Sequence, residues 1–132
     1  VFAAAGIDIP ETRKWVSPYS VAQAKAVCAE LLGGPCRPTA LLCGNDVIAQ
    51  GCVYAAVQTG VGVPTELSVV GIGDFKGSKE MEPSLTTVRI PAKTIGEKAA
   101  GLIVRLIAGE ETALIREEFP TEMMARGSTL AR

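Results

Sequence analysis

A strand, a helix and a second strand follow one another within about 30 residues in the middle of this chain, as a parallel crossover requires. TALLC at residues 39–43 is a short continuous apolar run, as expected of a parallel strand that is covered on both faces. From Asp46 the apolar residues recur at helical spacing, and we expect this helix to end near Thr59, because Gly60 stands where a left-handed cap is needed. LSVVGI at residues 67–72 is a second buried strand. The sequence therefore predicts an α/β fold with a parallel sheet at its core.

The same periodicities predict further elements on both sides of this unit. A Ser-Pro pair, which suits an N-cap and a first helical turn, precedes a helix predicted over residues 18–32. SLTTVRI at residues 84–90 alternates as an exposed or single-sided strand would, and another helix runs from Pro91 to Gly109. The remaining residues suggest two strands, ALIREEF and TEMMARGS, broken by Pro120.

The composition favours one packed domain without a nucleic-acid surface of its own. The 132 residues are 48% hydrophobic, and 13 Lys and Arg residues against 14 Asp and Glu residues give a net charge of -1. A domain that grips a phosphate backbone carries a basic patch, which this balance does not supply. No apolar run reaches the roughly 18 to 20 residues that a membrane helix needs. The chain begins without Met, and we expect it to be part of a longer protein.

Four cysteines bear on metal binding and on the cellular compartment. Cys28, Cys36, Cys43 and Cys52 are spaced too widely for a Cys-x-x-Cys motif, and the chain has no His. A structural zinc site would need all four thiolates together, so we expect neither a metal nor a cofactor. All but Cys36 lie among apolar residues of predicted helices or strands, where thiols act as small hydrophobic side chains in a reducing compartment. The sequence therefore favours a cytoplasmic protein.

Polar side chains follow both central strands at the point where each strand ends. Asn45 and Asp46 come directly after the first strand, and Asp74 closes the second in VVGIGD. Ligands of open parallel sheets bind beyond the carboxyl ends of the strands, and an Asn amide offers both a donor and an acceptor. Capping is the alternative role: either Asn45 or Asp46 can cap the helix that begins near Val47, which leaves the other side chain free to reach into the crevice. Two polar groups at one edge predict a ligand site there.

The glycine-rich stretch GIGDFKG does not match a dinucleotide-binding fingerprint. Its glycines are Gly71, Gly73 and Gly77, and the polar residues 73–83 have the composition of a loop rather than of a helix start. These glycines favour instead a sharp turn or a close approach of the backbone to a ligand.

Three stretches in a fixed order resemble a known protein family. They are PTALLCGNDVIAQGCVYAAVQTGVGVPTELSVVGIGDF, PSLTTVRIPAKTIGEKAAGLI and PTEMMARGST. From about Gly6 to Thr129 the chain closely resembles the effector-binding domain of LacI/GalR-type bacterial transcription repressors. Three motifs at matching intervals are far more specific than any single dipeptide.

This resemblance implies a fold and a domain organisation. Members of the family have an N-terminal DNA-binding helix-turn-helix, followed by two similar α/β lobes of the periplasmic-binding-protein-like type I fold with a small effector between them. We expect residues 1–132 to form the C-terminal part of the effector-binding domain, a three-layer parallel-sheet lobe that is incomplete here, with the helix-turn-helix absent. The family's chain crosses to the other lobe and returns, so residues 89–118 are expected to pack in the N-terminal lobe.

The resemblance also implies roles for single residues. Asn45 is similar to the amide that bonds effector hydroxyls, and Tyr19 matches a position where an aromatic ring often packs on the ligand; packing at the helix end is the alternative for Tyr19. Many members carry Asp two residues after the strand glycine, but this chain has Gly73 there and the carboxylate follows as Asp74. Similar forms occur in branches that resemble gluconate-type regulators. A sugar acid is therefore a candidate effector, because one carboxylate fewer in a pocket repels an anion less.

The function that the resemblance implies is that of an allosteric sensor rather than an enzyme. A sugar or sugar acid binds between the lobes and controls operator DNA binding through the absent N-terminal domain. A homodimer is expected, with surfaces near residues 47–59 at its interface. The chain has no His, no Gly-x-Ser-x-Gly elbow and no Cys paired to a base, so we expect no catalysis.

Two alternative functions share the fold class. A periplasmic sugar-binding protein of a transport system would have the same pocket, and the sequence upstream of Val1 would separate the two, since a regulator has a helix-turn-helix there and a transport protein has a signal peptide. A small flavodoxin-like α/β enzyme is the other alternative, which a phosphate or a flavin bound near Gly71 to Gly77 would support.

Overall fold

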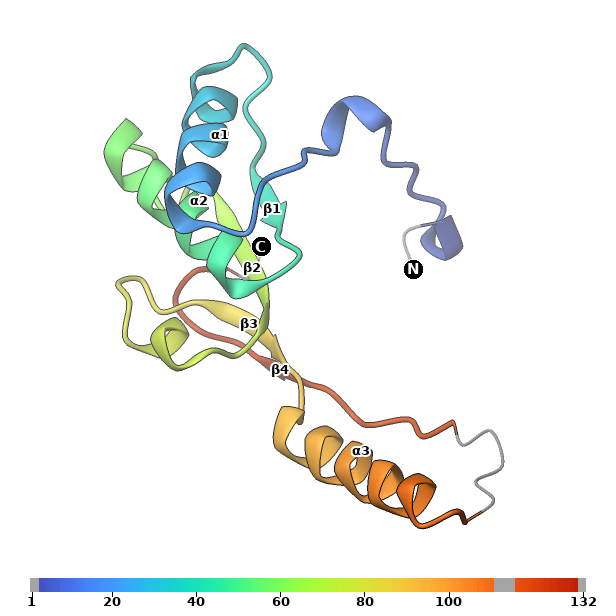
Figure 1. Ribbon diagram of the computed structural model, residues 1–132. Coiled ribbons are helices and arrows are strands. Elements are labelled where there is room, and N and C mark those ends of the chain that lie inside the picture. Colours follow the sequence, from blue (N-terminus) through green and yellow to red (C-terminus); the bar gives the residue numbers. More distant parts are fainter. Residues whose placement is uncertain (1–2, 111–115, 131–132) are drawn as a thin grey trace.

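A four-stranded sheet in the order β1-β2-β3-β4 organises the protein. The computed structural model describes residues 3–110 and 116–130. The strands are β1 (Ala40–Leu42), β2 (Ser68–Gly73), β3 (Thr86–Arg89) and β4 (Glu122–Met124). The first three run parallel, and β4 lies antiparallel beside β3 (Figure 1). The predicted α/β fold with a parallel core sheet is confirmed.

Two helices pack on one face of this sheet and enclose the core. They are α1 (Val21–Gly33) and α2 (Asp46–Thr59), which lie side by side (Figure 1). Because the small side chains of α2 include Ala49, Ala55 and Ala56, all fully buried, α2 approaches both α1 and the sheet closely. The rest of the core comes from the same two helices and from the strands and their loops: Cys28, Leu32, Cys43, Cys52, Val53, Val61, Leu67, Val69, Met81 and Leu85.

The helix boundaries agree with the sequence at one helix and differ at the other. Helix α2 ends at Thr59, and Gly60 takes the left-handed conformation (φ 72°) that the pattern predicts. The helix predicted from residue 18 begins instead at Val21. The reason is local: the Ser20 amide donates to the Pro18 carbonyl oxygen at 2.8 Å, so the Ser-Pro pair forms a turn before the helix rather than its first turn.

The C-terminal strands are shorter than the sequence predicts. TEMMARGS forms only β4, and the part of ALIREEF within the described residues, 116–119, forms no strand; residues 113–115 lie outside the description. Backbone groups need a neighbouring strand to form a ladder, and residues 116–121 run away from the sheet toward α3 (Figure 1). Among the described residues of the two predicted strands, only residues 122–124 form a strand.

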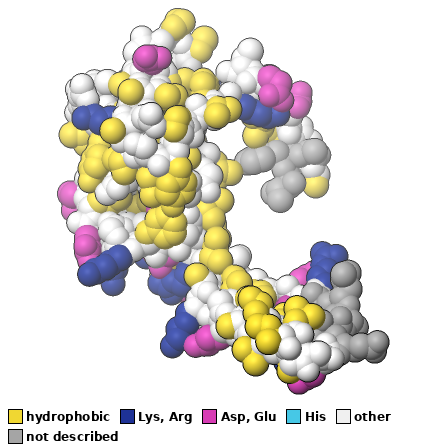
Figure 2. Space-filling model, in the orientation of Figure 1, with side chains coloured by type: hydrophobic (Ala, Val, Ile, Leu, Met, Phe, Trp, Pro, Cys, Tyr) yellow, Lys and Arg dark blue, Asp and Glu magenta, His cyan; other side chains and the backbone are white. Residues whose placement is uncertain are grey.

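Helix α3 (Ala92–Ile107) stands apart from the sheet and has no buried residue. Two connections join it to the sheet, one leaving β3 and one returning to β4 (Figure 1). Its apolar side chains gather on one side (Figure 2), and Ile103 and Ile107 are 56% and 81% exposed. Among the described helices, none is both long and apolar enough to cross a membrane.

Candidate functional site

The residues that follow β1 and β2 lie at one edge of the sheet. The two strands are parallel neighbours, with Leu42 opposite Val70, so their carboxyl ends point the same way. Asn45 follows β1 across a short loop, and Asp74 follows β2 directly. The edge at which the sequence predicts a ligand site therefore carries both polar residues, and each is half-buried.

Asn45 caps α2, as one of the two roles considered from the sequence requires. Its Oδ1 atom accepts a hydrogen bond from the Ile48 amide at 2.9 Å. Within the described part of the chain, the Nδ2 group of Asn45 has no hydrogen-bond partner. The amide can therefore serve as a cap through its oxygen while its nitrogen stays available as a donor.

Asp46, the first residue of α2, does not reach into an open crevice, as it could have if Asn45 took the cap. It is 3% exposed and is bonded to the loop after β2 and to β3. Oδ2 accepts from the Phe75 amide at 2.8 Å and from Ser78 Oγ at 2.5 Å, and Oδ1 accepts from Thr87 Oγ1 at 2.5 Å. The sequence alone did not indicate this role for Asp46. Gly71 was the available signal, because a Cβ atom there would lie 2.3 Å from Asp46 Oδ1.

Gly73 and Asp74 form a sharp turn directly after β2. Gly73 has a φ of 133° and Asp74 a φ of 52°, both in the region that L side chains rarely adopt. A Cβ atom on Gly73 would lie 2.6 Å from Cε1 of Phe75, so the ring occupies the space that a side chain would need. The prediction that a glycine lets the chain turn sharply here is confirmed at Gly73.

Both carboxylate oxygens of Asp74 bind arginines. Oδ2 accepts from Arg89 Nε at 2.7 Å, and Oδ1 accepts from Arg126 Nη2. The Asp74 side chain is 11% exposed. Burial alone would raise the pKa of Asp74, but the hydrogen bonds and charges of Arg126 and Arg89 outweigh burial and hold that pKa below its ordinary value.

This ion-pair network lies at the base of both connections to α3. Arg89 is the last residue of β3, and its Nη1 donates to Glu122 Oε2, on the first residue of β4, at 3.0 Å. Arg126, just after β4, also donates to the Leu85 carbonyl oxygen at 2.9 Å. Asp74 therefore ties the carboxyl edge of β2 to the two strands that lead to and from α3.

Tyr19 is not joined to these residues. Its side chain is 67% exposed, just before the N-cap of α1, and it makes no hydrogen bond with a described residue. The structure thus links Asn45, Gly73 and Asp74 through Asp46 and the turn after β2, while Tyr19 stays separate.

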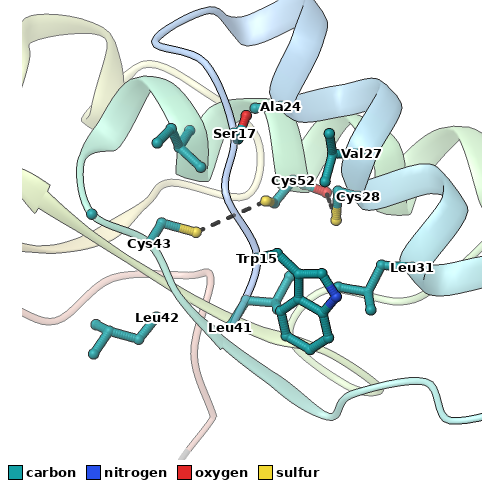
Figure 3. A pocket seen from close by; sticks show the side chains of 12 residues that line it. Trp15, Ser17, Ala24, Val27, Cys28, Leu31, Leu41, Leu42, Cys43 and Cys52 are labelled. Carbon is teal, nitrogen blue, oxygen red and sulfur yellow. Dashed lines mark hydrogen bonds between the residues drawn. The ribbon is translucent and has the colours of Figure 1, made fainter. Parts of the chain in front are cut away.

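An apolar cavity of about 110 Å³ lies between α1, β1 and the segment before α1 (Figure 3). Its lining includes Trp15, Val27, Leu31, Leu41 and the thiols of Cys28, Cys43 and Cys52. Ligand sites combine an apolar wall with several converging polar groups. The only side chain with a hydroxyl, amide or charge among its lining residues is that of Ser17, so the cavity lacks the converging polar groups of such a site.

Two of the thiols in this cavity, those of Cys28 and Cys52, are held in their neutral form. Cys43 Sγ lies 3.8 Å from Cys52 Sγ, and Cys28 Sγ donates to the Cys52 carbonyl oxygen at 3.9 Å. Hydrogen bonding to Cys52 and burial raise the pKa of Cys28 above its ordinary value. For Cys52, the hydrogen bond with Cys28 lowers the pKa, but the bond with Cys43 and burial outweigh it and raise the pKa to about 12. No group of three His, Cys, Asp or Glu residues in the described part could hold a metal ion.

Comparison with known proteins shows matches along almost the whole chain. A family model described as "periplasmic binding protein-like domain" matches residues 1–129. The HTH-type transcriptional regulator GntR of Pseudomonas aeruginosa is 36% identical over 112 residues, which are 85% of this chain and 33% of that protein. The chain therefore spans about a third of the length of this curated relative.

Two solved structures share the fold. A transcriptional regulator CelR in complex with cellobiose has a TM-score of 0.88 and 28% identity, over 96% of this chain and 39% of that chain. A sugar-binding transcriptional regulator of the LacI family from Escherichia coli, in complex with phosphate, has a TM-score of 0.84 and 25% identity, over 99% of this chain and 47% of that chain.

Proposed function

The chain belongs to the periplasmic binding protein-like domain family, as part of a LacI/GalR-type effector-binding domain, and we propose that it senses a small sugar or sugar acid to control operator DNA binding. One observation carries this proposal. The amide of Asn45 and the turn that contains Gly73 and Asp74 lie at the same carboxyl edge of β1 and β2, and Asn45 Nδ2 has no partner among the described residues. A donor at such an edge suits a hydroxylated ligand.

The effector would bind between this sheet edge and a second lobe that lies elsewhere in the full-length protein. Residues 89–118 are proposed to pack in that lobe. The observation in support is that α3 buries none of its residues, although one side of it is apolar. Tyr19 is exposed just before the N-terminus of α1. In this proposal its ring would cover the ligand only once the second lobe closes.

Coupling to DNA would proceed through the connections between the lobes. An effector that binds the closed form better than the open form shifts that equilibrium, and the shift changes the separation of DNA-binding segments outside this chain. Both connections leave the sheet next to the ion pairs that Asp74 forms with Arg89 and Arg126. A change at the effector edge would therefore reach the connections through these ion pairs.

A homodimer through the outer side of α2 completes the proposal. Tyr54 and Val57 are 41% and 65% exposed on this helix, although both are large and hydrophobic. A hollow of about 200 Å³ beside the first turn of α2, lined by Val47, Phe75 and Met81 among others, continues the surface. A two-fold dimer matches an operator with paired half-sites.

The relatives described above are regulators, and this disfavours both the transport protein and the enzyme as alternatives. The direct test is calorimetric titration of the full-length protein with cellobiose, ribose, sucrose and gluconate. We expect the wild type to bind at least one of them. Failure of the whole panel would refute a sugar or sugar acid effector of these types.

Two variants of Asn45 separate binding from capping. Asn45→Ala removes both functions, whereas Asn45→Asp keeps an oxygen to cap α2 but removes the Nδ2 donor. We expect both variants to lose affinity for the sugar by about tenfold or more, since an unpaired ligand hydroxyl costs about 1–3 kcal/mol. Only Asn45→Ala should lose stability, by about 1–2 kcal/mol. Normal affinity in Asn45→Asp would return Asn45 to a purely capping role.

A further inference from the structure

Asp46 joins three segments that meet at the proposed effector edge. Its backbone begins α2 directly after Asn45, its Oδ2 atom holds Phe75 and Ser78 of the loop after β2, and its Oδ1 atom holds β3. The loop contains the short helix η3 (Lys76–Lys79). The buried Asp46 side chain therefore links the start of α2, directly after Asn45, to Phe75, directly after Asp74.

A relay runs from Asp46 to the backbone of Asp74 itself. Thr87 Oγ1 donates to Asp46 Oδ1 at 2.5 Å, and the same oxygen accepts from the Asp74 amide at 3.4 Å. Because a hydroxyl has one proton, the bond to Asp46 directs the oxygen's lone pairs toward donors such as the Asp74 amide. Asp46 thus constrains the backbone on both sides of the Asp74 side chain, through Phe75 N and through Thr87.

The turn at Asp74 needs such support. A non-glycine residue in the left-handed region is strained by about 1–3 kcal/mol and persists only where its surroundings hold it. Asp74 has a φ of 52°. Gly71 leaves room for the support, because a Cβ there would meet Asp46 Oδ1 at 2.3 Å and the Asp46 Cα at 3.2 Å.

We propose that Asp46 is a positioning residue for the effector site: its carboxylate holds the turn after β2 against the first turn of α2, and this sets the spacing between the Asn45 amide and the Asp74 carboxylate. The inference deepens the proposed function and rests on it for the identity of the site. A carboxylate suits this place because it accepts hydrogen bonds from Phe75, Ser78 and Thr87 at once, whereas an amide there would turn its NH₂ group toward one of these partners and lose at least one accepted hydrogen bond.

The first experiment needs no ligand. Amide hydrogen exchange of residues 74–78 is measured in the full-length wild type, in Asp46→Asn and in Gly71→Ala, whose methyl group would displace the Asp46 side chain. We expect exchange in this loop to accelerate by about tenfold or more in both variants, while the C-terminal half of α2 exchanges as in the wild type. Unchanged exchange in the loop would overturn the proposal.

The second experiment distinguishes positioning from a general loss of stability. Cellobiose and gluconate are titrated well below the melting temperature into wild type, Asp46→Asn, Thr87→Val and Thr87→Ser. Val53→Ala serves as the control, because Val53 is a fully buried residue of α2 that has no bond to the loop. We expect a loss of affinity of about tenfold in Asp46→Asn, a smaller loss in Thr87→Val and recovery in Thr87→Ser, which keeps the hydroxyl.

Each outcome bears on one of the two proposals. If Val53→Ala loses as much affinity as Asp46→Asn, the effect is one of stability and the positioning role is refuted. If the wild type binds neither sugar, these two effectors are excluded for the proposed function, and the exchange of residues 74–78 still decides whether Asp46 holds the turn.

Discussion

At the scale of single residues, Asn45 and Asp46 show how two side chains of nearly equal size take different roles. Asn45 has one acceptor for the helix end and a donor that remains at the sheet edge. Asp46 accepts three hydrogen bonds and is 3% exposed. From the sequence either could cap α2, because the choice depends on which donors the loop after β2 brings near. Those donors come from residues that are about 30 positions away in the chain.

The pairing of Asp74 with two arginines predicts a defined pH dependence. Its pKa is depressed in the folded state, so its contribution to stability is complete above the ordinary value of 3.8 and is lost as the pH falls through the lower folded-state pKa. We expect the difference in unfolding free energy between wild type and Asp74→Asn to be constant from neutral pH to about 4 and to shrink below it.

Urea unfolding of both proteins across this range measures that difference. Glu30→Gln is the matched control, because Glu30 is exposed on α1 and should contribute little at any pH. A wild-type advantage that grows as the pH falls below 3.8 would contradict the ion-pair role of Asp74.

The cysteines predict a second result at this scale. Cys36 is exposed, whereas Cys28, Cys43 and Cys52 are buried and free. Raised pKa values keep Cys28 and Cys52 as thiols at moderately alkaline pH, and a thiol does not attack a disulfide reagent. We expect an aromatic disulfide reagent to label Cys36 rapidly in the folded protein and the other three only after unfolding. Peptide mass mapping checks this, and Cys36→Ser should remove the rapid phase.

At the scale of elements, α3 departs most from the behaviour of an ordinary surface helix. Its apolar spacing predicts a helix between Pro91 and Gly109, and the structure has one at Ala92–Ile107. An amphipathic stripe normally faces a core. No residue of α3, however, is buried against the rest of the described chain. The stripe is therefore a surface whose partner must come from outside the described residues, as the proposed packing against a second lobe provides.

A substitution on that stripe tests the proposal. In the full-length protein Ile107→Glu would place a charge in the contact, and we expect the unfolding free energy to fall by about 2–3 kcal/mol. Thr94→Glu introduces the same side chain on the exposed opposite side of α3 and should change it by less than about 0.5 kcal/mol. Equal effects of the two substitutions in denaturant unfolding would argue that Ile107 remains in solvent.

At the scale of the whole molecule, the arrangement is open on one side. The segment that precedes α1 projects from the lobe, and so does α3. A hollow lies between the two (Figure 2). The sheet face opposite α1 and α2 carries Leu42 and Met123, which are 62% and 59% exposed. In an α/β fold a sheet face with large apolar side chains is normally covered by a layer of helices. This openness agrees with a chain that covers 39% and 47% of the two solved structures to which it is similar.

The proposed dimer belongs to this scale. We expect the full-length protein to have twice the mass of one chain in light scattering, and Val57→Glu on the outer side of α2 to yield the monomer at micromolar concentration. Gln23→Glu on the exposed side of α1 is the matched control and should leave the dimer intact. If the dimer persists in Val57→Glu, the interface does not include the outer side of α2.

The sequence by itself determined the parallel strand-helix-strand unit, the end of α2 at Thr59 and the presence of polar residues at one sheet edge. These follow from local periodicity and from residues such as Gly60, whose effects act within a few positions. Only the tertiary structure decided that Asp46 is sealed under the turn after β2 and that Asp74 binds Arg89 and Arg126. The physical reason is that each of these carboxylates is satisfied by donors from distant segments, and which donors meet depends on how the strands register in space.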